Sequence, residues 1–206
     1  MTKIKICGLK RKEDIEYVNE LKPDYIGFVF AQSKRKVDKE TAKELKNLLD
    51  DDIMSVGVFV DDDIDLVADL VNDSVIDIVQ LHGNEDQKYI DLLKEKTSPE
   101  LKVIKAVKVK STEDILEAKD LDVEYLLLDT YSKEMAGGSG KEFDKTLIPK
   151  DLKNYFLAGG LDASNLEKNI LKYKPFAVDL SSGVETDGVK DKIKIKQVID
   201  IVRKTY

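Results

Sequence analysis

Short apolar runs alternate with helical segments from one end of the chain to the other, and this alternation is the strongest constraint on the fold. Continuous apolar runs such as residues 25–30 and 125–129 are typical of parallel strands buried on both faces. Between such runs, apolar residues recur at helical spacing, as in residues 13–21. Because about eight such units follow one another, the sequence predicts an α/β fold, a single (β/α)8 TIM barrel spanning residues 1–206. An open doubly wound sheet is the alternative.

The pattern also predicts the individual elements. The expected strands cover residues 3–7, 25–30, 54–60, 76–81, 102–107, 125–129, 155–158 and 176–180. The expected helices cover residues 13–21, 38–49, 64–72, 85–96, 112–119, 145–152, 164–171 and 190–203. Residues 130–143 contain three glycines and lack an apolar period, so we expect a long loop there, which acts either as a lid or as a simple connector.

Composition narrows the function classes. The net charge of −7 argues against nucleic acid or an acidic membrane surface as the main partner, so an anionic ligand would have to be held by local groups. A single cysteine rules out an internal disulfide, and no Cys/His cluster suggests a metal site. With neither a signal-peptide pattern nor an apolar run of membrane-spanning length, we expect a cytoplasmic protein, either a monomer or a homodimer.

The only cysteine, Cys7, is the last residue of the first expected strand, and Gly8 is expected to turn the backbone sharply there. In a parallel barrel, chemistry takes place at the carboxyl ends of the strands. A lone cysteine is often only a small buried hydrophobic residue. Strand alternation leads us to expect that Lys5 points away from Cys7, so no helper for thiol ionisation is predicted.

Asp129 ends the apolar sixth strand, where a carboxyl group beside apolar surface suits a general acid. Strands one and six lie three positions apart in an eight-membered ring, so Cys7 and Asp129 should face each other across the mouth. Asp129 could instead merely cap the following turn.

Glycine and serine residues follow the last two expected strands: Gly159 and Gly160 after the seventh, and Ser182 and Gly183 after the eighth. In barrel enzymes, the loops after these two strands often bind phosphate through backbone N–H groups and a short extra helix. Ordinary tight turns are the alternative.

Two further residues are candidates because their types are rare in this chain. Arg35, one of three arginines, lies in the loop after the second strand, where its planar guanidinium could bind a carboxylate in two-point contact. Solvated surface is the alternative. His82, the only histidine, follows the fourth strand, although a lone histidine is more often a packed or hydrogen-bonded residue than a ligand or a base.

Several motifs resemble those of the phosphoribosylanthranilate isomerase family of tryptophan biosynthesis. Their order and spacing make the match specific over nearly the whole chain. The motifs are KICG (5–8), GFVF with SKR (27–35), VGVFV (56–60), VQLHGNE (79–85), LLLDT (126–130), GGSGKEFD (137–144), AGGLDASN (158–165) and AVDLSSGVE (177–185).

The resemblance implies a (β/α)8 barrel that performs an Amadori rearrangement of N-(5-phosphoribosyl)anthranilate, a phosphosugar, without cofactor or metal. It implies Cys7 as general base and Asp129 as general acid. Arg35 is expected near the anthranilate, and Asp179 is expected to orient its amino group, while Gly160, Ser182 and Gly183 would help to hold the phosphate.

Two other functions remain open at the level of sequence. A related histidine-pathway isomerase performs the same rearrangement on another ribotide, but that barrel is expected to carry an aspartate where this chain has Cys7. A non-catalytic phosphosugar-binding module would keep the phosphate loops without the chemistry, and the presence of both Cys7 and Asp129 argues against it.

Overall fold

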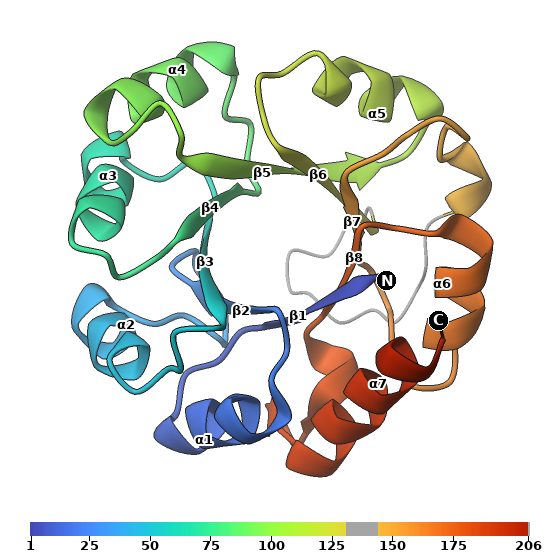
Figure 1. Ribbon diagram of the computed structural model, residues 1–206. Coiled ribbons are helices and arrows are strands. Elements are labelled where there is room, and N and C mark those ends of the chain that lie inside the picture. The colour runs from blue at the N-terminus through green and yellow to red at the C-terminus, as the bar shows by residue number, and fades with distance from the viewer. Residues whose placement is uncertain (131–143, 206) are drawn as a thin grey trace.

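The computed structural model describes residues 1–130 and 144–205 and shows a closed barrel of eight parallel strands in sequential order, β1 to β8. The helices surround this barrel as an outer ring (Figure 1). The strands are β1 Lys3–Cys7, β2 Tyr25–Val29, β3 Met54–Phe59, β4 Ile78–Leu81, β5 Lys102–Val109, β6 Tyr125–Thr130, β7 Tyr155–Leu157 and β8 Ala177–Leu180. Closure by pairing of β1 with β8 confirms the predicted barrel and excludes the open sheet.

The helices follow the strands at nearly the predicted positions. They are α1 Lys12–Leu21, α2 Lys39–Lys46, α3 Ile64–Asn72, α4 Gln87–Lys96, α5 Thr112–Lys119, α6 Leu166–Tyr173 and α7 Lys192–Lys204. Aspartates begin several of them, since the side chains of Asp38, Asp63, Asp86 and Asp191 accept hydrogen bonds from backbone N–H groups of the first turn. In every described helix the length or the polarity is incompatible with crossing a membrane.

Two differences from the predicted elements matter for the site, and one predicted element is not described. The helix expected over residues 145–152 is only a 3₁₀ turn, Lys145–Leu147. Residues 182–190, expected to be mostly a loop leading into the last helix, contain a 3₁₀ turn Ser182–Val184 and a small antiparallel hairpin, β9 Glu185–Thr186 with β10 Val189–Lys190. The predicted loop over residues 130–143 lies outside the described residues except for Thr130, which ends β6.

Two apolar layers explain why the strands are hydrophobic on both faces. The outer layer packs the strands against the helices and includes Ile4 and Ile6 of β1. The inner layer fills the barrel and includes Tyr25 and Phe156, whose rings meet edge to face with centroids 5.5 Å apart.

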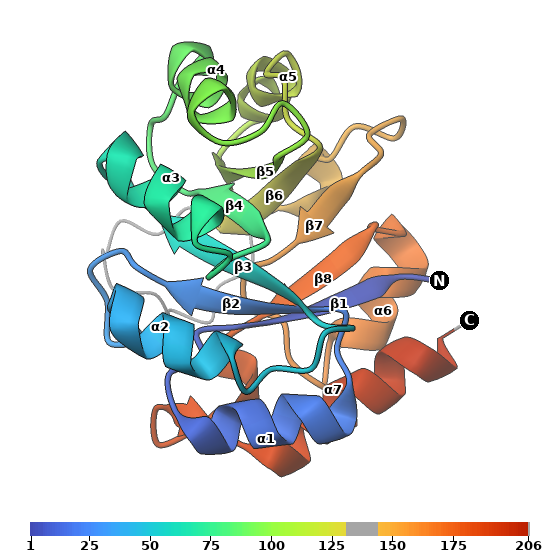
Figure 2. The ribbon, with the colours of Figure 1, turned by 60° about the vertical axis from the view of Figure 1, so that its left-hand side comes forward.

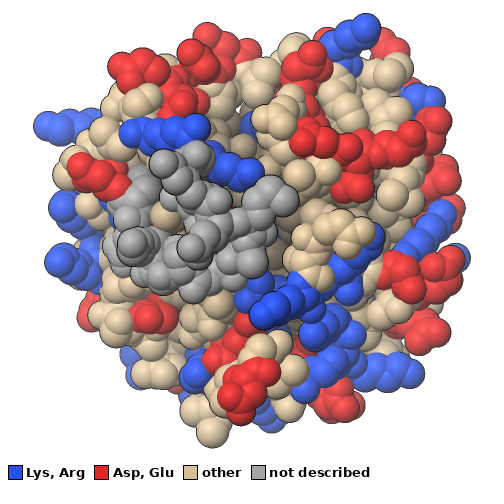
Figure 3. All heavy atoms as spheres, turned by 180° about the vertical axis from the view of Figure 1, so that it is seen from behind, with Lys and Arg blue, Asp and Glu red and all other residues tan. Residues whose placement is uncertain are grey.

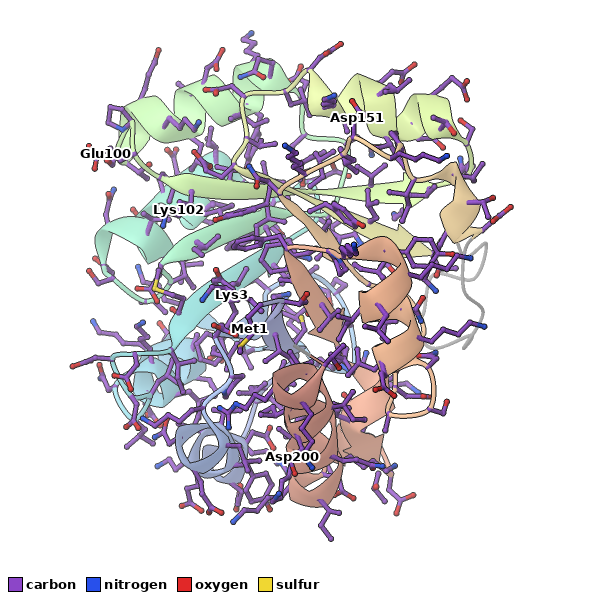
Figure 4. All side chains as sticks on the ribbon, turned by 45° about the vertical axis from the view of Figure 1, so that its right-hand side comes forward. Met1, Lys3, Glu100, Lys102, Asp151 and Asp200 are labelled. Atoms are coloured by element: carbon purple, nitrogen blue, oxygen red, sulfur yellow. The ribbon has the colours of Figure 1, made fainter. Side chains whose placement is uncertain are left out.

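Because the strands are parallel, their carboxyl ends share one end of the barrel. Figure 2 shows the strands and their surrounding helices from the side. Lys3 and Lys102, the first residues of β1 and β5, lie toward the opposite end (Figure 4). Cys7 and Asp129 therefore belong to the same, carboxyl end, as predicted.

Candidate active site

A cavity of about 340 Å³ opens at the carboxyl ends of the strands. This volume lies at the lower end of the range for small-molecule sites. The structure brings all nine residues selected from the sequence to its wall: Cys7, Arg35, His82, Asp129, Gly159, Gly160, Asp179, Ser182 and Gly183. Gln80 and Thr130 also line the cavity, although no motif or position in the sequence predicted a role for them.

Cys7 lies at the last position of β1 and is a free thiol with 8% of its surface exposed. Burial raises the pKa of this thiol above its ordinary value of 9.0, although the positive charge and a hydrogen bond of Lys5 act in the opposite direction. The cavity thus holds one thiol with a cation as its neighbour.

The expectation that Lys5 points away from Cys7 is wrong. Residues two apart in a strand project to the same face, so Lys5 and Cys7 both point into the barrel. Lys5 is completely buried, and its Nζ donates to Asp179 Oδ2 at 3.0 Å and to Gln80 Oε1 at 2.8 Å. Burial is the largest single influence and would lower the pKa of Lys5. The charges and hydrogen bonds of Asp179 and Cys7 together outweigh burial and raise the pKa, so Lys5 is an ammonium ion.

Replacing Lys5 by methionine is expected to raise the pKa of the Cys7 thiol further, because the cation that favours the thiolate is removed. The rate of iodoacetamide alkylation, followed against pH, measures this shift on a chain with one cysteine. We also expect the free energy of unfolding to fall by up to about 3 kcal/mol, because Asp179 is left as a largely buried charge without its partner.

The double variant Lys5→Met with Asp179→Asn is the matched control. Removing both charges should recover most of the lost stability in urea unfolding, while the Cys7 thiol remains hard to ionise. If the alkylation rate of Lys5→Met depends on pH in the same way as that of the wild type, Lys5 does not influence the pKa of the thiol.

Asp129 lies near the end of β6, and both of its carboxyl oxygens have a nitrogen atom as a neighbour. The backbone N–H of Thr130 donates to Oδ1 at 2.7 Å. His82 Nε2 lies 3.4 Å from Oδ2. On its other side, His82 Nδ1 lies 3.1 Å from Gln80 Nε2. His82 therefore contacts the candidate general acid rather than standing alone in the wall of the cavity.

Arg35 reaches the cavity wall from the loop after β2 and is held by a carboxylate of the protein itself. Its Nε and Nη2 donate to the two oxygens of Glu185 at 2.7 and 2.8 Å, which leaves the other edge of the guanidinium to meet an anion. Gly8, at φ +87°, permits this placement, because a Cβ there would lie 2.4 Å from the Arg35 side chain.

Glu185 also binds a buried lysine. Lys190 Nζ lies 2.6 Å from Glu185 Oε1 and donates to the Ser181 carbonyl at 3.0 Å. Although burial opposes ionisation, hydrogen bonds from Arg35 and Lys190 lower the pKa of Glu185 to about 2. This ion cluster explains why Lys190 lies in the β9–β10 hairpin and not in the predicted last helix.

The turns after β7 and β8 approach each other closely at the cavity. A Cβ on Gly183 would lie 2.0 Å from the Leu161 carbonyl oxygen, so only glycine allows this approach. Ser182 and Gly183 open the 3₁₀ turn after β8, where backbone N–H groups lack partners within the turn. Gly160 follows β7 with φ +66°. The two loops form the kind of backbone surface that was predicted to bind phosphate.

Two buried side-chain oxygens of the cavity residues have no hydrogen-bond partner in the described part of the chain. They are Thr130 Oγ1 and Asp179 Oδ1. A buried polar atom without a hydrogen-bond partner lowers the stability of the fold unless a bound molecule supplies the hydrogen bond. Both atoms are therefore candidates for contact with a ligand.

Positive charge is concentrated locally despite the net charge of −7. Figure 3, which views the end of the barrel opposite to that facing the reader in Figure 1, shows Lys and Arg side chains gathered beside the centre of this face. The loops after β1 and β2 lie at this end of the barrel and contact each other, since Lys10 Nζ donates to the Lys34 carbonyl at 3.1 Å. An anionic ligand at the cavity would therefore be attracted by nearby positive charges, although the molecule as a whole is negatively charged.

Taken together, the closed barrel and its carboxyl-end cavity place the chain among the (β/α)8-barrel enzymes. The chain belongs to the N-(5'-phosphoribosyl)anthranilate isomerase family, whose model matches residues 4–201.

Relatives and solved structures agree with this assignment. The chain is 52% identical to the N-(5'-phosphoribosyl)anthranilate isomerase of Endomicrobium trichonymphae, with 98% of this chain and 99% of the relative covered. It is 49% identical to that of Clostridium acetobutylicum, with 99% of each covered. The crystal structure of phosphoribosyl anthranilate isomerase from Thermotoga maritima superposes with a TM-score of 0.86 at 36% identity, covering 98% of this chain and 99% of that one.

A second solved structure is informative about ligands of the family. It is a phosphoribosyl anthranilate isomerase in complex with reduced 1-(o-carboxyphenylamino)-1-deoxyribulose 5-phosphate. It has a TM-score of 0.82 and 32% identity, and it covers 98% of this chain and 99% of that chain.

Proposed function

We propose that this protein catalyses the Amadori rearrangement of N-(5-phosphoribosyl)anthranilate to 1-(2-carboxyphenylamino)-1-deoxyribulose 5-phosphate in tryptophan biosynthesis, with Cys7 as general base and Asp129 as general acid. The observation that carries the proposal is that this thiol, this carboxyl group and the two glycine-containing loops line one and the same cavity. The rearrangement is intramolecular and needs only proton transfers from the enzyme, so a general acid and a general base can perform it without a cofactor or a metal.

In the first step, Asp129 donates a proton to the ribose ring oxygen. The bond between C1 and that oxygen breaks, and the anthranilate nitrogen supplies the electron pair that forms the C1=N bond of a Schiff base. Thr130 N–H, which donates to Asp129 Oδ1, favours the carboxylate that remains after the proton has left.

In the second step, the thiolate of Cys7 removes the proton from C2. The electrons of that bond form a C1=C2 double bond, and the iminium nitrogen becomes neutral, which gives an enolamine. The enolamine then gains a proton at C1 and loses the hydroxyl proton at C2 to give the ketone. Lys5 supports this step because its positive charge favours the thiolate.

The remaining cavity groups bind the two ends of the substrate. The turns that contain Gly159, Gly160, Ser182 and Gly183 are suited to the phosphate, since they present backbone N–H groups. The edge of Arg35 that Glu185 does not occupy is suited to the anthranilate carboxylate. Asp179, whose Oδ1 is unpartnered, can accept a hydrogen bond from the anthranilate amino group.

The direct test is to generate phosphoribosylanthranilate in situ and to follow the loss of its fluorescence with the pure protein. We expect rapid consumption that depends on enzyme concentration. Consumption only of the histidine-pathway ribotide, assayed in parallel, would identify the alternative isomerase. Binding without conversion of either substrate would identify a phosphosugar-binding module.

Replacing Gly183 by alanine is expected to raise KM about tenfold or more, because the added Cβ forces the β7 and β8 loops apart and weakens the charged hydrogen bonds to phosphate. Gly188→Ala is the control, since this glycine lies in the neighbouring hairpin, where a Cβ would meet nothing within 4 Å. Its φ of +77° strains an alanine there, so thermal unfolding of both variants checks that the fold is retained. Equal KM values in steady-state assays of the two variants would contradict a phosphate site between these loops.

A further inference from the structure

A continuous row of polar side chains crosses the barrel from β1 to the carboxyl group of Asp129. Lys5 Nζ lies 2.8 Å from Gln80 Oε1, and Gln80 Nε2 lies 3.1 Å from His82 Nδ1. His82 Nε2 in turn lies 3.4 Å from Asp129 Oδ2. The row begins in the fully buried interior and ends in the wall of the cavity, where Gln80, His82 and Asp129 are all found.

The hydrogen-bonding chemistry of Lys5 fixes the direction of every bond in this row. An ammonium group has only donors, so the Gln80 atom that faces it must be the amide oxygen. The amide nitrogen, which has only donors, must then face His82. The imidazole Nδ1 can meet it only as an unprotonated acceptor, which leaves the ring proton of neutral His82 on Nε2, directed toward Asp129.

We propose that the buried Lys5 ammonium, acting through the Gln80 amide, holds His82 as the neutral tautomer with its proton on Nε2, so that His82 donates a hydrogen bond to Asp129. His82 and Gln80 are then positioning residues that act through Asp129. The catalytic part of this inference rests on the proposed role of Asp129 as general acid, whereas the tautomer itself does not.

The arrangement stabilises the state that forms when Asp129 gives up its proton. At that moment both carboxyl oxygens become negative, and each already has a donor in place: Thr130 N–H for Oδ1 and His82 Nε2–H for Oδ2. Donors fixed in advance toward developing charge cost little reorganisation during the reaction. A histidine with its proton on Nδ1 would instead turn a lone pair toward the carboxylate and repel it.

The tautomer can be measured directly, because the chain contains one histidine and its ring signals need no assignment by mutation. A long-range ¹H–¹⁵N spectrum of the ligand-free protein at about pH 8, above the ~6.5 at which free imidazole titrates, distinguishes the three ring states. We expect Nε2 at the position of a protonated nitrogen and Nδ1 at that of an acceptor. A proton on Nδ1, alone or together with Nε2, would overturn the proposal.

The variant Gln80→Glu replaces the hydrogen-bond donor that faces His82 Nδ1 by an acceptor. One carboxylate oxygen can still accept from Lys5, but the other now faces Nδ1 as an acceptor, so Nδ1 should become protonated in the same spectrum. An unchanged spectrum would overturn the proposal. Gln197→Glu, the same replacement on the exposed face of α7, is the matched control and should leave the spectrum unchanged.

Separate measurement of kcat and KM distinguishes a positioning role of Gln80 and His82 from a purely structural one. For Gln80→Glu we expect kcat to fall about tenfold to a hundredfold with little change in KM, because the substrate still binds but the donor to Asp129 is disturbed. A fall in kcat/KM that comes only from KM would contradict a role through Asp129. An inactive wild-type protein with the expected tautomer would refute the proposed function while leaving the inference about His82 intact.

Discussion

Replacing Cys7 by alanine is expected to lower turnover of phosphoribosylanthranilate at least about a hundredfold, because no other group of the described cavity wall occupies its place at the end of β1 as a base for the C2 proton. The barrel should fold normally. Cys7 belongs to a small apolar cluster with Val29 and Val58, so removing one sulfur atom leaves only a small void beside the open cavity.

The experiment compares kcat of the variant and the wild type, with thermal unfolding as the control for folding. The pH dependence of kcat/KM for the wild type gives a second measurement, since it reports groups of the free enzyme. Burial raises the pKa of Cys7 above 9.0, so the thiolate fraction, and with it kcat/KM, should rise with pH across the neutral range. A Cys7→Ala variant with nearly normal turnover would remove the thiol from the mechanism.

Replacing Asp129 by asparagine is expected to lower turnover by a similar factor, at least about a hundredfold. The amide has the size of the carboxyl group but cannot deliver a proton to the ring oxygen, so the C1–O bond would break without general acid catalysis. The substrate should still bind, because the phosphate loops and Arg35 are unchanged. We therefore expect the loss in kcat rather than in KM.

The matched control is Asp51→Asn, which makes the same replacement on the exposed surface and should leave kcat unchanged. The double variant Cys7→Ala with Asp129→Asn should lose less than the product of the two single losses, because the groups act in one reaction. Full turnover by Asp129→Asn would show that the proton of the first step comes from elsewhere, and the carboxyl group would then have only a structural role.

Many residues of the cavity wall could be predicted from the sequence alone. The alternation of strands and helices predicted the barrel, and the position of each residue after its strand predicted which side chains would meet. Cys7, Asp129 and Gly183 come from β1, β6 and the turn after β8. The sequence predicted that all three would meet, because parallel strands bring their carboxyl ends together. Local patterns suffice for this because strand order in the barrel follows chain order.

The sequence misplaced residues whose surroundings arise only from closure of the barrel. Lys190 was assigned to a helix on its local pattern, but in the structure it is buried against Glu185, within a cluster that Arg35 completes from the other end of the chain. The last expected strand begins one residue later than predicted, at Ala177, and ends at Leu180 as predicted.

By itself, the sequence determined the class of fold, the end of the barrel that carries the site and the types of chemical groups there, because these follow from the period of apolar residues and from position relative to a strand. Only the tertiary structure decided how those groups are paired. Lys5 lies opposite Asp179 because β1 pairs with β8, and it contacts Gln80 because both point into the same interior. Hydrogen-bond direction within the site depends on these contacts between distant strands, and no local pattern in the chain encodes them.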